Sequence, residues 1–238
     1  MLTVVMLNWA RPDNVMRNLV RYSSYDIVQQ IFCFNNSARL EGACRLPSKC
    51  VVVEASQDLG LYTRFAIAAL SPTDAIFHTD DDIGVPEETL QVLLENWRRS
   101  PLSCHGLYGR FVSDRYIRGN VFGAVDVVLT RALVCGAGTN LAALAARRQF
   151  DDLVCQPSGN GEDIVLSFAA MSMAGTRNCA YRLPAEDYSD KIASGHQPVS
   201  IHDRWAGHYE HRTRVVERCR TVFPLALSVI PTTAAAGN

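Results

Sequence analysis

Three aspartates, Asp80, Asp81 and Asp82, stand side by side directly after the apolar segment 74–79. Adjacent carboxylates repel one another, and aspartate is disfavoured in strands, so such a run either faces water or holds a positive group. Two carboxylates one residue apart at a strand end can point to the same side, which suits chelation of Mg²⁺ or Mn²⁺. That cation would keep open sites for the oxygens of a diphosphate.

A solvated acidic turn is the alternative to a cation site. A Gly-Val-Pro turn follows the three aspartates, and Glu87 and Glu88 lie in the first turn of the helix that we expect over 86–99. Aspartate is common in turns, and acidic residues near a helix N-terminus interact favourably with the helix dipole. Taken alone, the three aspartates are explained equally well by either structure.

The apolar runs of the first half indicate a parallel sheet. The run 2–7 is short, ends in polar residues and resembles a buried parallel strand, and we expect three further strands over 27–36, 50–56 and 74–79. Helical spacing and capping signals predict helices over 13–22, 61–70 and 86–99. Strands that alternate with helices form βαβ units, so we predict an α/β fold with a mostly parallel central sheet flanked by helices.

The second half of the sequence is less regular. We expect strands over 105–112, 121–136 and 178–183, helices over 140–150, 162–175 and 208–223, and a long loop over 184–204. With 238 residues, the chain is long enough for one large α/β domain. Its 23 basic and 24 acidic residues give a net charge of -1, so no global positive field indicates nucleic-acid binding.

Several polar residues follow the expected strands of the first half. In an open parallel sheet, ligands bind beyond the carboxyl ends of the strands. The loops at these ends contain a set of polar residues in addition to the triple aspartate, namely Arg11, Asp13, Asn35, Asn36 and Asp58. Arg64 lies near the start of the helix 61–70, from which it could reach the same edge. We therefore expect these side chains to share one site.

A second group of candidate residues lies late in the chain. Glu162 and Asp163 open a predicted helix, although acidic residues there are also explained by the helix dipole alone. Arg212 lies on the last helix, where its guanidinium fork would suit phosphate oxygens, or where it would simply face solvent. Four histidines in or near the late loop could supply one metal ligand: His196, His202, His208 and His211.

The motifs in order resemble those of the exostosin-type glycosyltransferases. They are N-x-x-R-P-D from residue 8, FNN from 34, YTRF from 62, HTDDDI from 78, NGEDIVLSF from 160 and GHYEHR from 207. The resemblance runs from about residue 3 to about residue 224. It implies a GT-A (nucleotide-diphospho-sugar transferase) fold with a DDD form of the DxD motif. The implied activity is metal-dependent transfer, with retention, of N-acetylhexosamine or hexose from a UDP-sugar to a carbohydrate or other hydroxyl acceptor.

The resemblance also implies roles for individual residues. Nucleotide-sugar binding would fall to Arg11, Asn35, Asn36, Arg64, Asp80 and Asp81, and Mn²⁺ or Mg²⁺ binding to Asp82 with Asp80. The catalytic residues would be Asp163 beside the anomeric carbon, Glu162, and Arg212, which would neutralise the leaving diphosphate. Glu162 stands where the family has aspartate, and Thr63 stands where it has asparagine. These two departures leave the donor sugar open.

We interpret residues 1–238 as a single glycosyltransferase domain. Residues 1–85 would form a nucleotide-binding half, 86–224 an acceptor-binding half and 225–238 a flexible tail. The acceptor would be a glycan or glycoconjugate, contacted by segments that include 113–120 and 184–207. The oligomeric state stays open.

Two other functions remain compatible with parts of the pattern. One is a non-catalytic nucleotide- or carbohydrate-binding module, in which Asp163 and Arg212 would have no role. The other is a nucleotidyltransferase, although the loop after the first strand, NWARPDN, lacks the glycines of a typical phosphate loop.

The sequence also bears on location. Its N-terminus lacks the basic start and long apolar core of a signal peptide, and no run reaches the length of a membrane span. We therefore expect a cytoplasmic protein, or one of the Golgi lumen if the sequence is trimmed from a longer chain. In an oxidising compartment Cys44 and Cys50, which flank a predicted loop, could form a disulfide.

Overall fold

The computed structural model describes residues 1–36, 46–112, 115–117, 119–154, 159–188 and 207–230. Within these residues, eight strands form one sheet in the order β3-β2-β1-β4-β10-β6-β11-β8. Their bounds are β1 (Leu2–Asn8), β2 (Val28–Asn35), β3 (Cys50–Glu54), β4 (Ala75–Thr79), β6 (His105–Gly106), β8 (Gly123–Val125), β10 (Ala132–Gly136) and β11 (Asn178–Ala180). Strands β1 to β4 pair in parallel, and β10 runs antiparallel to β4 and to β6.

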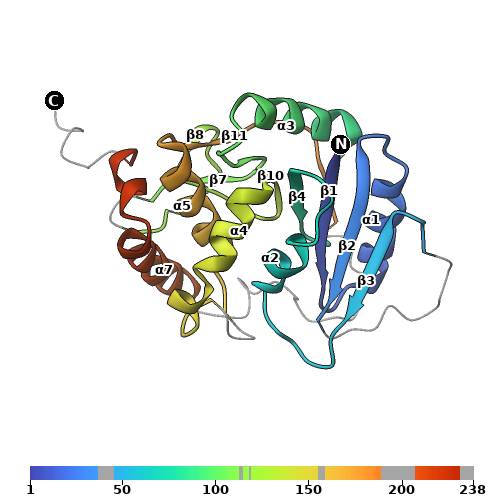
Figure 1. Ribbon diagram of the computed structural model, residues 1–238, viewed down its shortest axis with the longest axis horizontal. Coiled ribbons are helices and arrows are strands. Elements are labelled where there is room, and N and C mark those ends of the chain that lie inside the picture. The colour runs from blue at the N-terminus through green and yellow to red at the C-terminus, as the bar shows by residue number, and fades with distance from the viewer. Residues whose placement is uncertain (37–45, 113–114, 118, 155–158, 189–206, 231–238) are drawn as a thin grey trace.

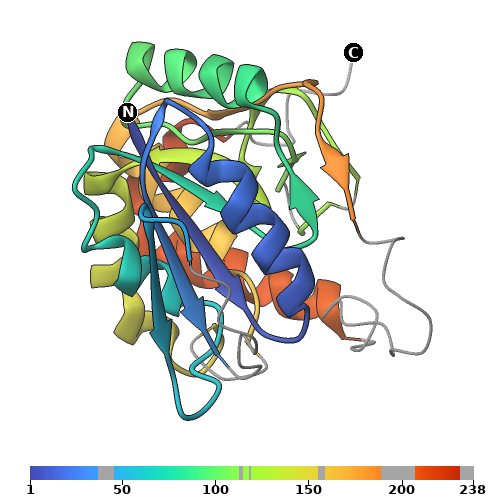
Figure 2. The same cartoon turned by 90° about the vertical axis from the view of Figure 1, so that its right-hand side faces the viewer.

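Helices cover both faces of this sheet (Figures 1 and 2). Their bounds are α1 (Pro12–Ser23), α2 (Thr63–Ala68), α3 (Glu87–Arg99), α4 (Ala137–Ala145), α5 (Glu162–Ala174) and α7 (His208–Val222). Successive strand side chains point to opposite faces. Val4 and Met6 thus belong to the apolar layer with α1 and α3, whereas Val5 belongs to the layer with α2, α4, α5 and α7. The predicted α/β fold with a mostly parallel central sheet is confirmed.

Helix α5 lies at the centre of the second apolar layer. Residues 162–171 are buried without interruption, as is typical of a helix that packs on all sides. Gly161 precedes the helix with φ 113° and Gly175 follows it with φ 64°, so glycines occupy both left-handed positions at its ends. The helix therefore begins at Glu162, and both acidic residues of its first turn enter the protein interior.

The elements of the first half agree with the prediction to within two residues, but those of the second half are shorter. The expected strand 105–112 divides into β6 and β7 (Gly109–Arg110), and 121–136 divides into β8, β9 (Val127–Val128) and β10. Asp126, between β8 and β9, is buried; it accepts the backbone N–H of Val112 at 2.8 Å and pairs with Arg177 at 2.9 Å. Because a buried carboxylate is stable only with such partners, Asp126 interrupts the strand that we expected over 121–136.

Two further differences concern the loop 184–204 and the C-terminus. Within that loop β12 (Glu186–Asp187) pairs with β5 (Ile83–Gly84), while residues 189–206 lie outside the described part of the chain. The flexible tail expected from residue 225 instead starts as a 3-10 helix, Pro224–Ser228, because Ala226 is buried in the layer that contains α5. A second 3-10 helix, Arg147–Phe150, follows α4. Among the described residues, no helix is long and apolar enough to cross a membrane.

Candidate active site

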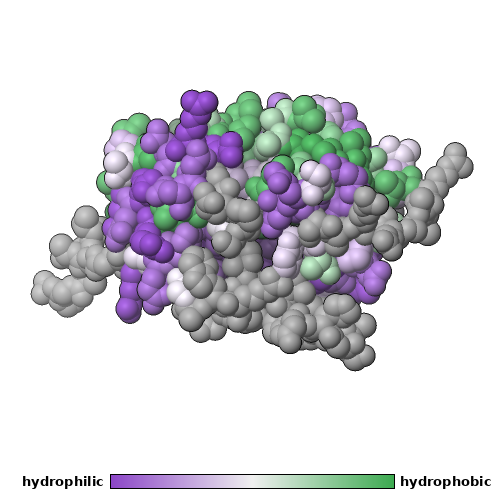
Figure 3. Space-filling view, turned by 90° about the horizontal axis from the view of Figure 1, so that it is seen from below, coloured by the Kyte–Doolittle hydropathy of each residue, from purple (hydrophilic) through white to green (hydrophobic). Residues whose placement is uncertain are grey.

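The carboxyl ends of β1, β2 and β4 lie at one edge of the sheet, the lower edge in Figure 1. Arg11 follows β1, Asn35 ends β2, and the three aspartates follow β4. Seen from below in Figure 3, the described residues on the left of this face are mainly hydrophilic. The predicted clustering at one edge therefore holds for the residues that follow β1, β2 and β4.

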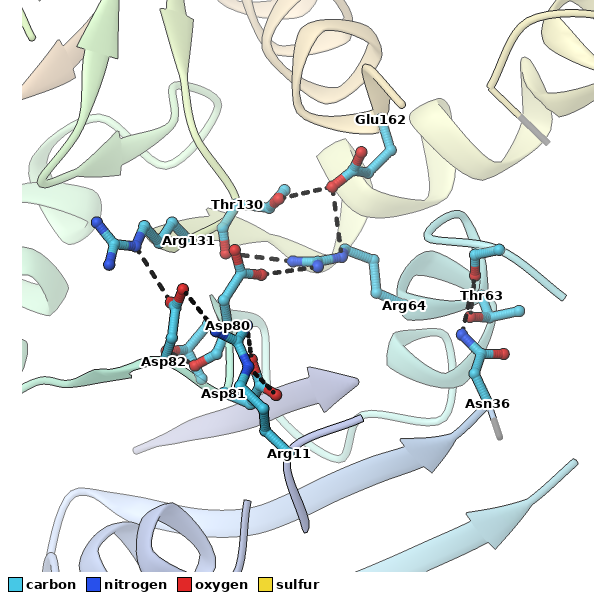
Figure 4. A network of polar contacts seen from close by, with 12 residues as sticks. Arg11, Asn36, Thr63, Arg64, Asp80, Asp81, Asp82, Thr130, Arg131 and Glu162 are labelled. Atoms are coloured by element: carbon cyan, nitrogen blue, oxygen red, sulfur yellow. Dashed lines mark hydrogen bonds and ion pairs between the residues drawn. The ribbon is translucent and has the colours of Figure 1, made fainter. Parts of the chain in front are cut away.

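Arg11 binds two of the three aspartates (Figure 4). Its Nε and Nη2 donate to the two carboxylate oxygens of Asp81 at 3.0 and 2.5 Å, and its Nη1 donates to Asp82 at 3.2 Å. Asp81 is buried, which raises the pKa of its carboxyl to about 7 although the Arg11 guanidinium acts in the opposite direction. The repulsion among the aspartates is thus reduced by a guanidinium fork.

Arg64 connects the triple aspartate to α5. This side chain is buried; its Nη2 donates to Asp80 at 2.9 Å and its Nη1 to the carbonyl of Thr130 at 3.2 Å. Its Nε lies 3.7 Å from Glu162, whose same carboxylate oxygen accepts the Thr130 hydroxyl at 2.8 Å (Figure 4). Burial raises the pKa of Glu162, and the Arg64 charge acts against that shift. The sequence placed Arg64 at this edge, but not its contact with Glu162.

A third arginine, Arg131, was missed in the sequence. Its Nε donates to Asp82 at 3.2 Å, and its Nη2 pairs with Asp187 of β12 at 2.8 Å. Its guanidinium also lies 4.9 Å from the centre of the Tyr108 ring. We expected one continuous strand over 121–136, and Arg131 lies inside it. No signal in the sequence therefore marked this position as the end of a strand that faces the aspartates.

Asp163 faces a different arginine from Glu162. Arg212 Nη2 donates to both Asp163 oxygens at 2.8 and 2.7 Å, and its guanidinium lies 4.3 Å from the centre of the Tyr116 ring. Arg212 also donates to the side chain of Asn160 and to the Tyr116 hydroxyl. Asp163 and Arg212 are 5% and 4% exposed, so the two charges balance each other inside the protein. Asn160 is the first residue of the motif NGEDIVLSF and Tyr116 lies in the segment 113–120, but no pattern in the sequence indicated that either residue contacts Arg212.

The two asparagines at the end of β2 are buried and bonded to the protein. Asn35 accepts from Asn8 at 2.8 Å and donates to Glu54 at 2.7 Å. Asn36 donates to the Gly60 carbonyl at 3.2 Å and accepts the backbone N–H of Leu59 at 3.1 Å. Both amides thus shape the strand end and the loop that follows β3, and their contact with a nucleotide stays a prediction.

The model of the glycosyl transferase family 64 domain matches residues 2–229, which include every candidate residue described above. The chain belongs to glycosyl transferase family 64. The match begins at β1 and ends just beyond the 3-10 helix Pro224–Ser228, so it covers nearly all of the described structure. A comparison with curated proteins finds no match to the family 64 chain by sequence.

Solved structures of glycosyltransferases share the fold of this family 64 chain. S. aureus TarS 1-349 in complex with UDP-GlcNAc matches with a TM-score of 0.58 at 13% identity, over 90% of this chain and 65% of that chain. GalNAc-T7 with UDP, GalNAc and Mn²⁺ matches with a TM-score of 0.53 at 10% identity, over 72% of this chain and 40% of that chain. The chain thus spans about two thirds or less of the length of the chains in these structures. At such identities the likeness shows the GT-A fold.

The residues at the sheet edge fit a hard divalent cation. Asp80 and Asp82 offer carboxylate oxygens, which suit Mg²⁺ or Mn²⁺. Arg64 binds one Asp80 oxygen, and Arg11 and Arg131 each bind one Asp82 oxygen, so a cation at Asp82 would share oxygens that already accept from arginines. No group of three Asp, Glu, His or Cys side chains that could hold a metal ion occurs among the described residues. Two carboxylates with further ligands from a diphosphate and water match the binding mode of Mg²⁺.

The remaining candidate site residues lie outside the described residues or make structural contacts. His196 and His202, the segment 189–206 as a whole, and Cys44 with its expected disulfide lie outside the described residues. His211 is buried and interacts through Nε2 with the Asn160 carbonyl at 3.0 Å, which is a structural contact beside Arg212. Asp58 accepts the backbone N–H of Gly60 at 2.8 Å and so stabilises a turn.

Proposed function

We propose that this family 64 chain is a metal-dependent, retaining glycosyltransferase of the exostosin-like type. It would transfer N-acetylhexosamine or hexose from a UDP-sugar to a hydroxyl of a glycan or glycoconjugate. The observation that carries the proposal is the connection between two acidic motifs: Arg64 joins Asp80 at the sheet edge to Glu162 on α5. The UDP-GlcNAc complex of TarS and the Mn²⁺ complex of GalNAc-T7, which share the fold, support a UDP-sugar donor and a divalent metal.

The donor's diphosphate would lie at the sheet edge. Asp82 and Asp80 would hold the cation, which would stabilise the charge of the leaving UDP. Arg11 and Arg64 already lie against the aspartates, and their positive charges would favour diphosphate binding beside them. Asp81 is engaged by the Arg11 fork, so it would hold Arg11 in place at the donor.

The sugar would extend from the diphosphate toward the N-terminus of α5. The bond between the anomeric carbon and the diphosphate oxygen would break with its electron pair leaving on UDP, and the acceptor oxygen would bond to the same carbon while its hydroxyl proton passes to the departing diphosphate oxygen. Asp163 would stabilise the positive charge that develops on the sugar or form a transient bond to it. Arg212, bonded to both Asp163 oxygens, would orient that carboxylate and add positive charge near the leaving diphosphate.

The deciding experiment measures UDP release from a panel of UDP-sugars in Mn²⁺ and in EDTA, with and without simple glycoside acceptors. We expect turnover only in Mn²⁺, and we expect Asp163→Asn to lower kcat by at least about 100-fold. Asp152→Asn is the matched control, because Asp152 pairs with Arg218 at an exposed position. The anomeric configuration of the product, read by NMR, tests retention.

Three results would count against the proposal. Neither turnover nor Mn²⁺-dependent UDP binding in the wild-type protein would refute the transferase function. UDP binding without turnover of any donor would favour a nucleotide-binding module. Unchanged turnover in Asp163→Asn would remove Asp163 from the catalytic residues.

A further inference from the structure

We propose that Glu162 is a positioning residue: it holds Arg64, and through Arg64 it sets the orientation of Asp80, without touching the sugar. This inference rests on the proposed function, because it takes the donor to bind at Asp80. It assigns different tasks to Glu162 and Asp163, which are adjacent in the sequence. It also adds Thr130 to the residues that shape the donor site.

Glu162 points into the protein. It is 3% exposed, and the oxygen that accepts the Thr130 hydroxyl at 2.8 Å also faces the Arg64 Nε at 3.7 Å. Both neighbours carry hydrogens on the atoms that face this carboxylate, so an ionised Glu162 is matched by its surroundings. One oxygen of the Glu162 carboxylate is therefore held by Thr130 and Arg64.

Arg64 depends on these partners because it is 2% exposed. A buried guanidinium is stable only where carboxylates or carbonyls surround it. Asp80 binds its Nη2 at 2.9 Å, the Thr130 carbonyl binds its Nη1 at 3.2 Å, and Glu162 balances its Nε side. Thr130 therefore contacts the network twice, with its carbonyl on Arg64 and its hydroxyl on Glu162 (Figure 4).

Of the three charged side chains in this network, Asp80 is the one that reaches solvent. The Asp80 side chain is 35% exposed, in contrast to the 3% and 4% of Arg64 and Glu162. A change at Glu162 should therefore reach a donor through Arg64 and Asp80. Asp163 is separated from this route, because its carboxylate is bound by Arg212. Loss of Glu162 should thus weaken donor binding, whereas loss of Asp163 should slow the chemical step.

Two substitutions test the charge and the length of the Glu162 side chain separately. Glu162→Gln keeps the length of the side chain and removes its charge, whereas Glu162→Asp keeps the charge and withdraws it by one methylene from Thr130 and Arg64. We expect each to raise the Kd for UDP and the KM for the donor by about tenfold, with kcat changed less than about threefold. Thr130→Val, which keeps the backbone carbonyl, should raise both constants by about threefold to fivefold.

The experiment combines calorimetry of UDP binding in Mn²⁺ with steady-state kinetics of each variant. Exposed Glu217→Gln and buried Thr139→Val, which lie on α7 and α4, are matched controls and should leave Kd, KM and kcat unchanged. Urea unfolding shows whether each variant is folded. If Glu162→Gln lowered kcat by about 100-fold or more with an unchanged Kd, the proposal would be overturned. Unchanged values of all three constants would overturn it as well.

A second measurement needs no donor. The Arg64 Nε–H signal in a ¹⁵N NMR spectrum, identified by its loss in Arg64→Lys, should exchange slowly with solvent in the wild-type protein. Protection should fall by at least tenfold in Glu162→Gln and Glu162→Asp but persist in Glu217→Gln. Equal protection in all of them would refute the contact of Glu162 with Arg64. If the wild-type protein fails to bind UDP, the proposed function fails, while this exchange result still decides whether Glu162 holds Arg64.

Discussion

Replacement of Arg212 by methionine should leave Asp163 as a buried charge without its cation. Arg212 is 4% exposed and binds both Asp163 oxygens, at 2.8 and 2.7 Å. Removing one partner of a buried ion pair costs about 3–5 kcal/mol, since the remaining charge is neither hydrated nor paired. Methionine keeps much of the side-chain length and its packing on Tyr116. The expected loss is a large part of the roughly 5–15 kcal/mol by which domains are stable.

The complementary variants provide the test of this estimate. Asp163→Asn removes the negative charge but leaves Arg212 bonded to Asn160 and Tyr116, so we expect a loss of about 2–3 kcal/mol. In the double variant an uncharged amide faces methionine. Its loss should be smaller than the sum of the two single losses by about 2 kcal/mol, because no unpaired charge remains buried.

The assay is urea unfolding followed by circular dichroism, with free energies from linear extrapolation. Arg214→Met, at an exposed position on the same helix, is the matched control and should change stability by less than about 0.5 kcal/mol. Additive losses within about 0.5 kcal/mol, or a loss below about 1 kcal/mol in Arg212→Met, would refute the description of Asp163 and Arg212 as a buried pair.

Three other results are expected. Asp82→Asn should weaken Mn²⁺-dependent UDP binding by about tenfold or more, because an amide is a poorer ligand for a hard cation; equal weakening in EDTA, measured by calorimetry, would contradict a metal role. Arg131→Met should lower the free energy of unfolding by about 1–2 kcal/mol, since it removes contacts with Asp82 and Asp187 at a partly exposed site, and exposed Arg98→Met serves as its control. Burial lowers the pKa of His78 from 6.5 to about 3, so below pH 6.5 the unfolded chain binds a proton that the folded chain does not, and stability falls as the pH decreases. Between pH 6.5 and 4.5 the wild-type protein should lose about 2 kcal/mol more than His78→Asn, and an equal loss in urea unfolding of both proteins would contradict this.

Much of the fold was predictable because its signals are local. Strands β1 and β4 are buried along their whole length, β2 is buried in part, and β3 is an apolar run with no fully buried residue; polar and turn residues mark where each of these strands ends. Helix α3 was indicated by Pro86 and the two glutamates that follow it. The short strands of the second half were less predictable, since their limits depend on Asp126 and its partners Val112 and Arg177, which lie 14 and 51 positions away in the sequence.

The sequence by itself determined which residues gather at the sheet edge. Parallel strands end on the same side, so Arg11, the asparagines at the end of β2 and the triple aspartate had to approach one another. The motifs also indicated a glycosyltransferase, and the family match over residues 2–229 agrees with that interpretation. The assignment of individual catalytic, nucleotide and metal roles stays a prediction.

Only the tertiary structure decided which acidic side chain pairs with which arginine. Glu162 and Asp163 are neighbours in the sequence, but successive residues of a helix point about 100° apart, so one meets Arg64 and the other meets Arg212. Tyr116 reaches Arg212 across 96 positions of sequence, and Arg131 reaches Asp82 across 49. Such contacts depend on how α5 and α7 pack against the sheet, and no local pattern of residues encodes that packing.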